Sequence, residues 1–164
     1  MQILTKTQIQ QKIARLAFEI LENNFEEKEL ILAGINFNGM TFAGMLRDAL
    51  LKITKIPVQL IQIRLNPAKP LQDPVVIDVD VEQLKGKAII IVDDVANTGR
   101  TIFYAVRPLM EIVPSKIEVA VLVDRKHKSF PIAVDYVGIS LATTIQEDID
   151  VRIRDTKAWA VHIH

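Results

Sequence analysis

The stretch AIIIVDDVANTGRTIFYAVR, residues 88–107, decides the fold class of this 164-residue chain. Its first five residues, 88–92, are all apolar and predict a fully buried strand that ends in two acids, Asp93 and Asp94. A short turn, Thr-Gly-Arg-Thr at 98–101, then leads into an amphipathic stretch that predicts a helix. A strand, an acidic strand end, a loop and a helix in this order are typical of the ligand-binding edge of an α/β sheet.

The residue types in this stretch suit a sugar phosphate. Backbone amides at the start of a helix are unpaired and bind anions, and Gly99 keeps the space in front of them clear, while Thr98 and Thr101 offer hydroxyls. The carboxylates of Asp93 and Asp94 are suited to accept hydrogen bonds from sugar hydroxyls or to hold Mg²⁺. The sequence therefore predicts a phosphate site and a sugar or metal site side by side.

Three residues of the stretch keep a second interpretation. Asp often forms the turn after a core strand, so Asp93 and Asp94 could be turn formers whose carboxylates lie near solvent. Arg100 could reach the phosphate or simply face solvent at the start of the helix. The complete string is more specific than either part, because acids, loop and helix follow one another in the order that the chemistry needs.

Composition limits the functions that the chain can have. Lys plus Arg and Asp plus Glu number 20 each, so no net field favours nucleic acid or an anionic membrane. The chain has no cysteine, which excludes disulfides, thiolate metal sites and a cysteine nucleophile. We expect a cytoplasmic protein without a membrane segment, because no apolar run reaches the length of a membrane span and no signal-peptide pattern opens the chain.

Helical and strand patterns alternate along the rest of the chain. Helices are expected over 9–21 and 40–51, with the proline-containing stretch 66–74 as an irregular loop. Further strands are expected over 30–35, 58–65, 75–79, 117–123, 134–139 and 151–153. The alternation predicts an α/β fold with a mostly parallel central sheet flanked by helices, in a single domain of residues 1–164.

The string from Asp93 to Thr101 resembles the phosphoribosyl pyrophosphate (PRPP) motif of the type I phosphoribosyltransferases. The resemblance implies that fold, a PRPP-dependent pentosyltransferase activity and Mg²⁺ as cofactor. It implies that Asp93 and Asp94 are catalytic residues that contact the ribose hydroxyls and the metal. It also implies a loop that holds PRPP through its 5-phosphate, formed by Ala96, Asn97, Thr98, Gly99, Arg100 and Thr101.

A second segment, VAVLVDRKHKSFPIAVDYVG at 119–138, resembles one subfamily, the bifunctional pyrimidine-operon attenuators that also act as uracil phosphoribosyltransferases. This resemblance implies that Asp124, Arg125 and His127 lie at the base pocket and that uracil is the leading acceptor. A solvated loop is the alternative for these charged residues. Asn97 stands where the enzymes for 6-oxopurines carry an Asp, and an amide cannot act as that base, which disfavours hypoxanthine and guanine.

The pyrophosphate loop departs from the family pattern Gly-Ile-x-x-Arg-Gly, which usually also has a Lys. In this chain the loop has no cation and consists of Ile35, Asn36, Phe37, Asn38 and Gly39. Positive groups aimed at developing charge are usually among the larger catalytic contributions, so we expect weaker binding, through backbone amides, Asn36 and Asn38.

The basic face that binds RNA in the attenuators is also depleted. Phe18, Asn23, Ala133 and Ile139 stand where the family has cationic residues or His, and RNA affinity depends on summed phosphate neutralisation. We therefore expect no RNA partner. The predicted function is transfer of ribose 5-phosphate from PRPP to a nucleobase in a homodimer or higher homo-oligomer. The alternative is a catalytically weak sensor of PRPP or nucleotides that regulates pyrimidine metabolism.

Overall fold

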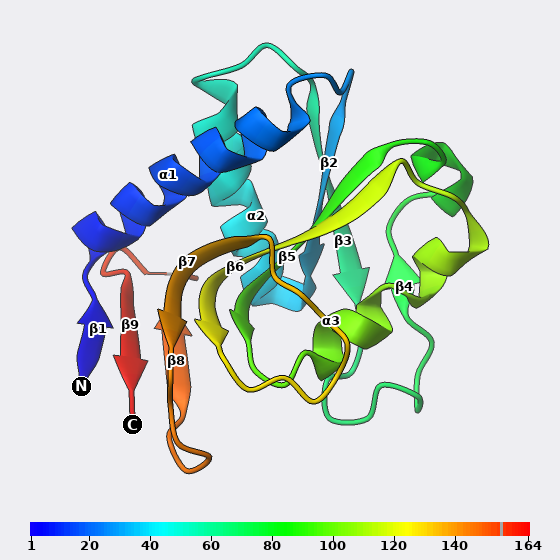
Figure 1. The fold of residues 1–164 in the computed structure, drawn as a ribbon. Helices are drawn as coiled ribbons and strands as arrows, with labels where there is room; N and C mark the ends of the chain where they lie inside the picture. Colours follow the sequence, from blue (N-terminus) through cyan, green and yellow to red (C-terminus); the bar gives the residue numbers. More distant parts are fainter. Residues whose placement is uncertain (155) are drawn as a thin grey trace.

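A six-stranded sheet forms the centre of the molecule in the computed structural model, which describes residues 1–154 and 156–164 (Figure 1). The strands lie in the order β4-β3-β2-β5-β6-β7, and all neighbours pair in parallel except β4, which runs antiparallel to β3. Their bounds are β2 Leu30–Ile35, β3 Val58–Arg64, β4 Val76–Ile77, β5 Ala88–Ala96, β6 Lys116–Arg125 and β7 Tyr136–Leu141. The predicted fold class, a mostly parallel α/β sheet, is confirmed.

Helices cover both faces of this sheet because its central strands are apolar on both sides. In β5, Ile90 and Val92 pack toward α1 and α2, whereas Ile89 and Ile91 pack toward α3 and the short 3₁₀ helices. The bounds of these elements are α1 Lys6–Asn24, α2 Asn36–Leu51, α3 Arg100–Ala105, η1 Val81–Leu84 and η2 Arg107–Glu111. Within the described residues, no helix is both long and apolar enough to cross a membrane.

A small antiparallel sheet brings the two ends of the chain together beside the main sheet (Figure 1). It consists of β1 Gln2–Leu4, β9 Ala160–Ile163 and β8 Ile149–Arg152, in that order. The amino group of Met1 donates a hydrogen bond to the carbonyl of Ile163 at 2.7 Å. Strand β8 contacts β5, so the C-terminal hairpin reaches the strand that carries the acids.

Several element boundaries differ from the expected ones, and three of these differences affect the elements around residues 88–107 and the turn after β2. Helix α2 begins at Asn36, directly after β2, because Asn36 adopts a left-handed φ of 51° and turns the chain without a loop. Strand β5 continues through both acids to Ala96, since β6 pairs with it that far. Helix α3 has only six residues, because Pro108 follows and restricts the backbone before it.

Candidate functional site

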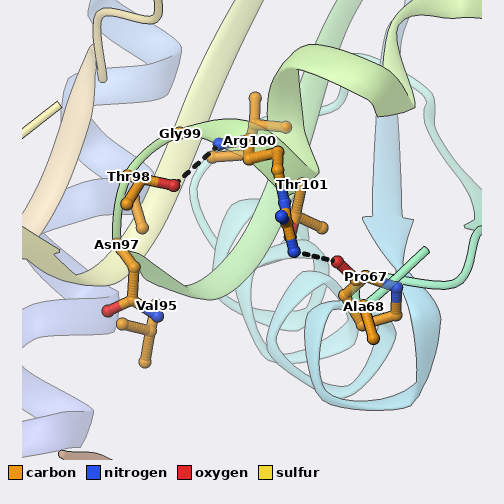
Figure 2. A pocket seen from close by; sticks show the side chains of 10 residues that line it. Pro67, Ala68, Val95, Asn97, Thr98, Gly99, Arg100 and Thr101 are labelled. Atoms are coloured by element: carbon orange, nitrogen blue, oxygen red, sulfur yellow. Dashed lines mark hydrogen bonds between the residues drawn. The ribbon is translucent and has the colours of Figure 1, made fainter. Parts of the chain in front are cut away.

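The loop between β5 and α3 forms a cradle, the segment 97–101, at the carboxyl end of the sheet (Figure 2). Gly99 has a φ of 86°, which favours glycine, and a Cβ on it would lie 3.2 Å from the Cβ of Ile132. A cavity of about 510 Å³ opens in front of this loop. Its lining consists of Pro67, Ala68, Val95, Ala96, Asn97, Thr98, Gly99, Arg100, Thr101 and Ile102.

Backbone amides of the cradle are available to a ligand. Among the residues that the structure describes, no oxygen accepts a hydrogen bond from the amides of Thr98, Gly99 or Thr101, and the Arg100 amide reaches only the Thr98 hydroxyl at 3.4 Å. Such donors need a partner, and an anion can supply it. Because α3 is so short, we attribute this capacity to the loop amides more than to a helix dipole.

Arg100 is exposed at the start of α3 and lines the cavity in front of the cradle. Its Nη2 donates a hydrogen bond to the carbonyl of Pro67 at 2.7 Å, across the mouth of the cradle (Figure 2). This contact ties the proline-containing stretch 66–74 to the start of α3. The guanidinium therefore forms part of the rim of the cavity.

The two acids of β5 lie in different environments. Asp93 is only 9% exposed, contrary to the expectation that both carboxylates lie near solvent, and its Oδ1 accepts the Asp94 amide at 2.9 Å. Burial, followed by the negative charge of Asp94, holds the pKa of Asp93 well above its usual range. Asp94 is half-buried; its Oδ1 accepts the Val95 amide at 2.9 Å and its Oδ2 accepts Asn38 Nδ2 at 3.0 Å. Asp94 is therefore the acid better placed to meet a ligand.

These acids fit a metal that is shared with a ligand. The described residues contain no group of three or more His, Cys, Asp or Glu side chains that could hold a metal ion by themselves. Mg²⁺ commonly binds through one or two carboxylates together with substrate phosphates and water, and Asp94 with Asp93 behind it offers that donor set. The chemistry of the site thus fits Mg²⁺ that arrives with a phosphorylated ligand.

The predicted pyrophosphate loop is the first turn of α2. Asn36 Oδ1 accepts the Leu65 amide at 3.1 Å, so this oxygen holds the end of β3. Gly39 lets α2 approach β5 closely, since a Cβ there would lie 2.6 Å from the Val92 carbonyl oxygen. Phe37 is 67% exposed and points to the cleft. This turn and both acids line a second cavity, of about 450 Å³, which is formed by Ile35, Asn36, Phe37, Asn38, Pro67, Asp93, Asp94, Val95, Asn97, Thr101, Ile149 and Arg154.

A third cavity, of about 200 Å³, lies where the base pocket is predicted. It is lined by Asn97, Thr98, Arg125, His127, Thr143 and Ile145. Arg125 shapes this cavity, because its guanidinium donates to Asn97 Oδ1 at 3.3 Å and to Thr143 Oγ1 at 2.6 Å. Asp124 is not among the lining residues, and its carboxylate pairs with Lys128 Nζ at 2.6 Å.

Asn97 lines all three cavities and Thr101 lines the two larger ones, so the cavities are neighbouring parts of one cleft. In the cleft, the cradle, the acids and the third cavity lie around the same loop. Sequence patterns gave no reason to include Thr143 or Arg154, which tertiary packing brings to the cleft from distant segments. For Arg154 the one pattern in the sequence was the alternation of apolar and charged residues at 151–154. This alternation predicts that Arg154 lies outside the core, but it does not predict which residues Arg154 faces.

Comparisons with known proteins agree with this geometry. Residues 1–156 match the phosphoribosyl transferase domain family. The bifunctional protein PyrR of Ligilactobacillus salivarius is 38% identical over 161 residues, which cover 93% of this chain and 90% of that protein. The pyrimidine operon regulatory protein of Lactococcus lactis subsp. lactis is 32% identical over 159 residues, covering 94% and 90%.

A solved structure shows the same fold. The hypoxanthine phosphoribosyltransferase of Trypanosoma cruzi matches 98% of this chain and 94% of its own chain with a TM-score of 0.80, at 19% sequence identity. The motif around the acids, the fold and the sequence relatives lead to one assignment. The chain belongs to the type I phosphoribosyltransferase family and is similar to PyrR proteins.

Proposed function

We propose that this protein transfers ribose 5-phosphate from PRPP to a nucleobase, with uracil as the leading acceptor. The observation that carries the proposal is the single cleft around Asn97. A cradle of available amides lies at one end, an acid pair in the middle and a small cavity beside them. PRPP has a phosphate, two sugar hydroxyls and a pyrophosphate in an arrangement that this cleft complements.

The transfer exchanges one bond at C1 of the ribose. The bond from C1 to the pyrophosphate oxygen breaks, and its electron pair leaves with the oxygen. The lone pair of a ring nitrogen of the base forms the new bond to C1, and the proton of that nitrogen leaves to solvent. No covalent enzyme intermediate is needed, so the residues of the cleft act by positioning both reactants and by stabilising charge.

Each part of the cleft has a role in this proposal. The amides of the cradle and the hydroxyls of Thr98 and Thr101 bind the 5-phosphate. Asp94, supported by Asp93, accepts hydrogen bonds from the ribose hydroxyls and would hold Mg²⁺ together with PRPP. When bound, Mg²⁺ supplies charge neutralisation to the leaving pyrophosphate. The first turn of α2 faces the pyrophosphate.

Two observations favour a pyrimidine acceptor. Asn97 Oδ1 accepts a hydrogen bond from Arg125, and an amide at this place cannot serve as a base toward a purine. The relatives include a protein named for the pyrimidine operon. The cavity of about 200 Å³ beside Asn97 is the proposed place of the base, with Arg125 and His127 in its wall.

RNA binding is not part of the proposal. Arg15 on α1 donates from Nη2 to the carbonyl of Gly138 at 2.8 Å and pairs with Glu19 at 2.7 Å, so its charge is used within the chain. Phe18 beside it is 60% exposed where the attenuators resembled have His. Loss of several phosphate contacts lowers RNA affinity by orders of magnitude.

A PRPP or nucleotide sensor is the second candidate, and one observation favours it. The first turn of α2 has no cation, and Asn38 there donates to Asp94, which leaves little positive character for a leaving pyrophosphate. Release of pyrophosphate from PRPP and Mg²⁺, measured with uracil, cytosine, orotate, adenine and hypoxanthine, separates the two functions. Turnover with uracil supports the transferase, whereas PRPP binding without turnover on any base supports the sensor.

A further inference from the structure

The cavity beside the first turn of α2 receives one side chain from a distant part of the chain. Arg154 lies just after β8 and lines this cavity together with Phe37, Asn38, Asp93 and Asp94. Among the described residues that line it, Arg154 is the only Lys or Arg. The C-terminal hairpin thus brings a permanent positive charge to the place where the turn itself has none.

The hairpin fixes where Arg154 lies. Val151 and Ile153 are 7% and 2% exposed and are anchored in the core that α1 and α2 cover. Strand β8 also pairs with β9 and contacts β5. Ile153 is buried, whereas Arg154, in the bend that follows β8, is exposed, so its side chain lies outside the core and lines the cavity.

Phe37 gives the guanidinium a platform. The guanidinium carbon of Arg154 lies 5.1 Å from the centre of the Phe37 ring, within the range of a cation–π contact. This contact explains an exposed phenyl group in a turn that faces a charged ligand, where a polar residue would be expected. It also limits the rotamers of a long side chain, which lowers the entropy lost when the side chain binds an anion.

We propose that Arg154 is the pyrophosphate-binding cation of this cleft and that Phe37 is the residue that positions its guanidinium. The inference rests on the proposed function, because it assigns a residue to the pyrophosphate part of the same site. A guanidinium is suited to the task, since its planar donors bind two phosphate oxygens at once. The cation that the turn of α2 lacks is supplied from the C-terminal hairpin.

Calorimetric titration with two separate ligands, inorganic pyrophosphate and ribose 5-phosphate, tests the assignment in a buffer with Mg²⁺. Arg154→Gln should weaken pyrophosphate binding about tenfold or more, as expected for loss of a charged hydrogen bond, and leave ribose 5-phosphate binding unchanged. Arg154→Lys should recover part of the affinity. Arg152→Gln is the matched control, because Arg152 is two residues away, pairs with Asp150 at 2.7 Å and does not line the cavity.

Phe37 variants test the positioning role. Phe37→Ala should weaken pyrophosphate binding about two- to fivefold, in line with a modest cation–π contact, and Phe37→Tyr should restore it. In the double variant with Arg154→Gln, Phe37→Ala should have no further effect, because the ring acts through the guanidinium.

The outcomes distinguish this inference from the proposed function. If wild type binds both ligands but Arg154→Gln binds pyrophosphate as wild type does, Arg154 is not the cation and the proposed function stands. Equal losses for both ligands, with a lowered melting temperature, would show a structural role for Arg154 and overturn the assignment. If wild type binds neither ligand, both the proposed function and this inference are wrong.

Discussion

The cradle at 97–101 and the first turn of α2 lie in the same cleft but are built in opposite ways. The cradle is made of backbone amides around a glycine with left-handed φ, and its side chains add only hydroxyls and a rim. The turn of α2 begins directly at the end of β2, and its side chains are used within the protein: Asn36 holds β3 and Asn38 holds Asp94.

The difference shows which part of a phosphate site can change. A site made of amides depends on backbone geometry, so almost any substitution that keeps the path of the chain keeps the site. A site made of charged side chains is lost with one or two substitutions. A cation from another segment of the chain can then bind the same phosphate group. Arg154 and the turn of α2 fit the second case.

Gly39→Ala should have the largest effect, because it separates the turn of α2 from β5. Its Cβ would lie 2.6 Å from the Val92 carbonyl oxygen, and overpacking of this kind costs about 1–3 kcal/mol of unfolding free energy. Urea unfolding measures the loss. Gly44→Ala is the matched control on the same helix: nothing lies within 4 Å of its Cβ, and it should gain up to about 1 kcal/mol. Equal stabilities of the two variants would mean that close packing at Gly39 is unimportant.

Gly99→Ala should weaken the cradle without unfolding the protein. The added Cβ meets Ile132 at 3.2 Å in a backbone conformation that alanine disfavours, so the loop shifts and ribose 5-phosphate affinity falls about tenfold, or roughly 1.4 kcal/mol. Gly86→Ala is the control, since Gly86 has a φ of 74° with nothing within 4 Å of its Cβ. It carries a similar backbone strain and should keep full affinity. A loss of ribose 5-phosphate binding in both variants would point to general strain.

Asn38→Arg should sharpen the comparison by returning a cation to the turn of α2. We expect turnover with PRPP and uracil to rise by up to about tenfold, roughly 1.4 kcal/mol, with little change in PRPP affinity, because charge on the leaving pyrophosphate grows in the transition state. Asn38→Ala separates this gain from the loss of the hydrogen bond to Asp94. If wild type turns over and Asn38→Arg is no faster, Arg154 and the amides already suffice; if neither protein turns over, the sensor is supported.

Asp93→Asn should make the protein more stable at neutral pH and poorer at binding PRPP. Burial and the charge of Asp94 raise the folded-state pKa of Asp93 above its unfolded value of about 3.9, so the folded state binds the proton more tightly. Unfolding free energy therefore falls as pH rises through the window between these two pKa values. The Asp93→Asn variant lacks this loss, because its side-chain amide does not ionise.

Melting temperatures of wild type and Asp93→Asn between pH 3 and pH 8 test this sign. At pH 7 the variant should melt about 2–4 °C higher for each kcal/mol gained, and the two proteins should converge at the acidic end. A lower melting temperature at pH 7 would mean that the charged carboxylate stabilises the fold. Asp94→Asn, at a half-buried position, should change the melting temperature less.

The sequence predicted the central sheet and the composition of the cradle because both depend on local pattern. Apolar runs marked β2 and β5, and the string from Asp93 to Thr101 marked the cradle. The burial of Asp93 was not predicted, because it depends on how far β6 pairs along β5. The start of α2 at Asn36 was missed because a left-handed φ at Asn leaves no periodic signal. Arg154 was missed because only tertiary packing brings the C-terminal hairpin to the cleft.

A crystal structure of the protein with PRPP and Mg²⁺ tests the central claim most directly. The account predicts the 5-phosphate against the amides of Thr98, Gly99 and Thr101, the ribose hydroxyls toward Asp94, and the pyrophosphate between the first turn of α2 and Arg154. PRPP bound outside this cleft, or bound in the reverse direction with its pyrophosphate in the cradle, would contradict it.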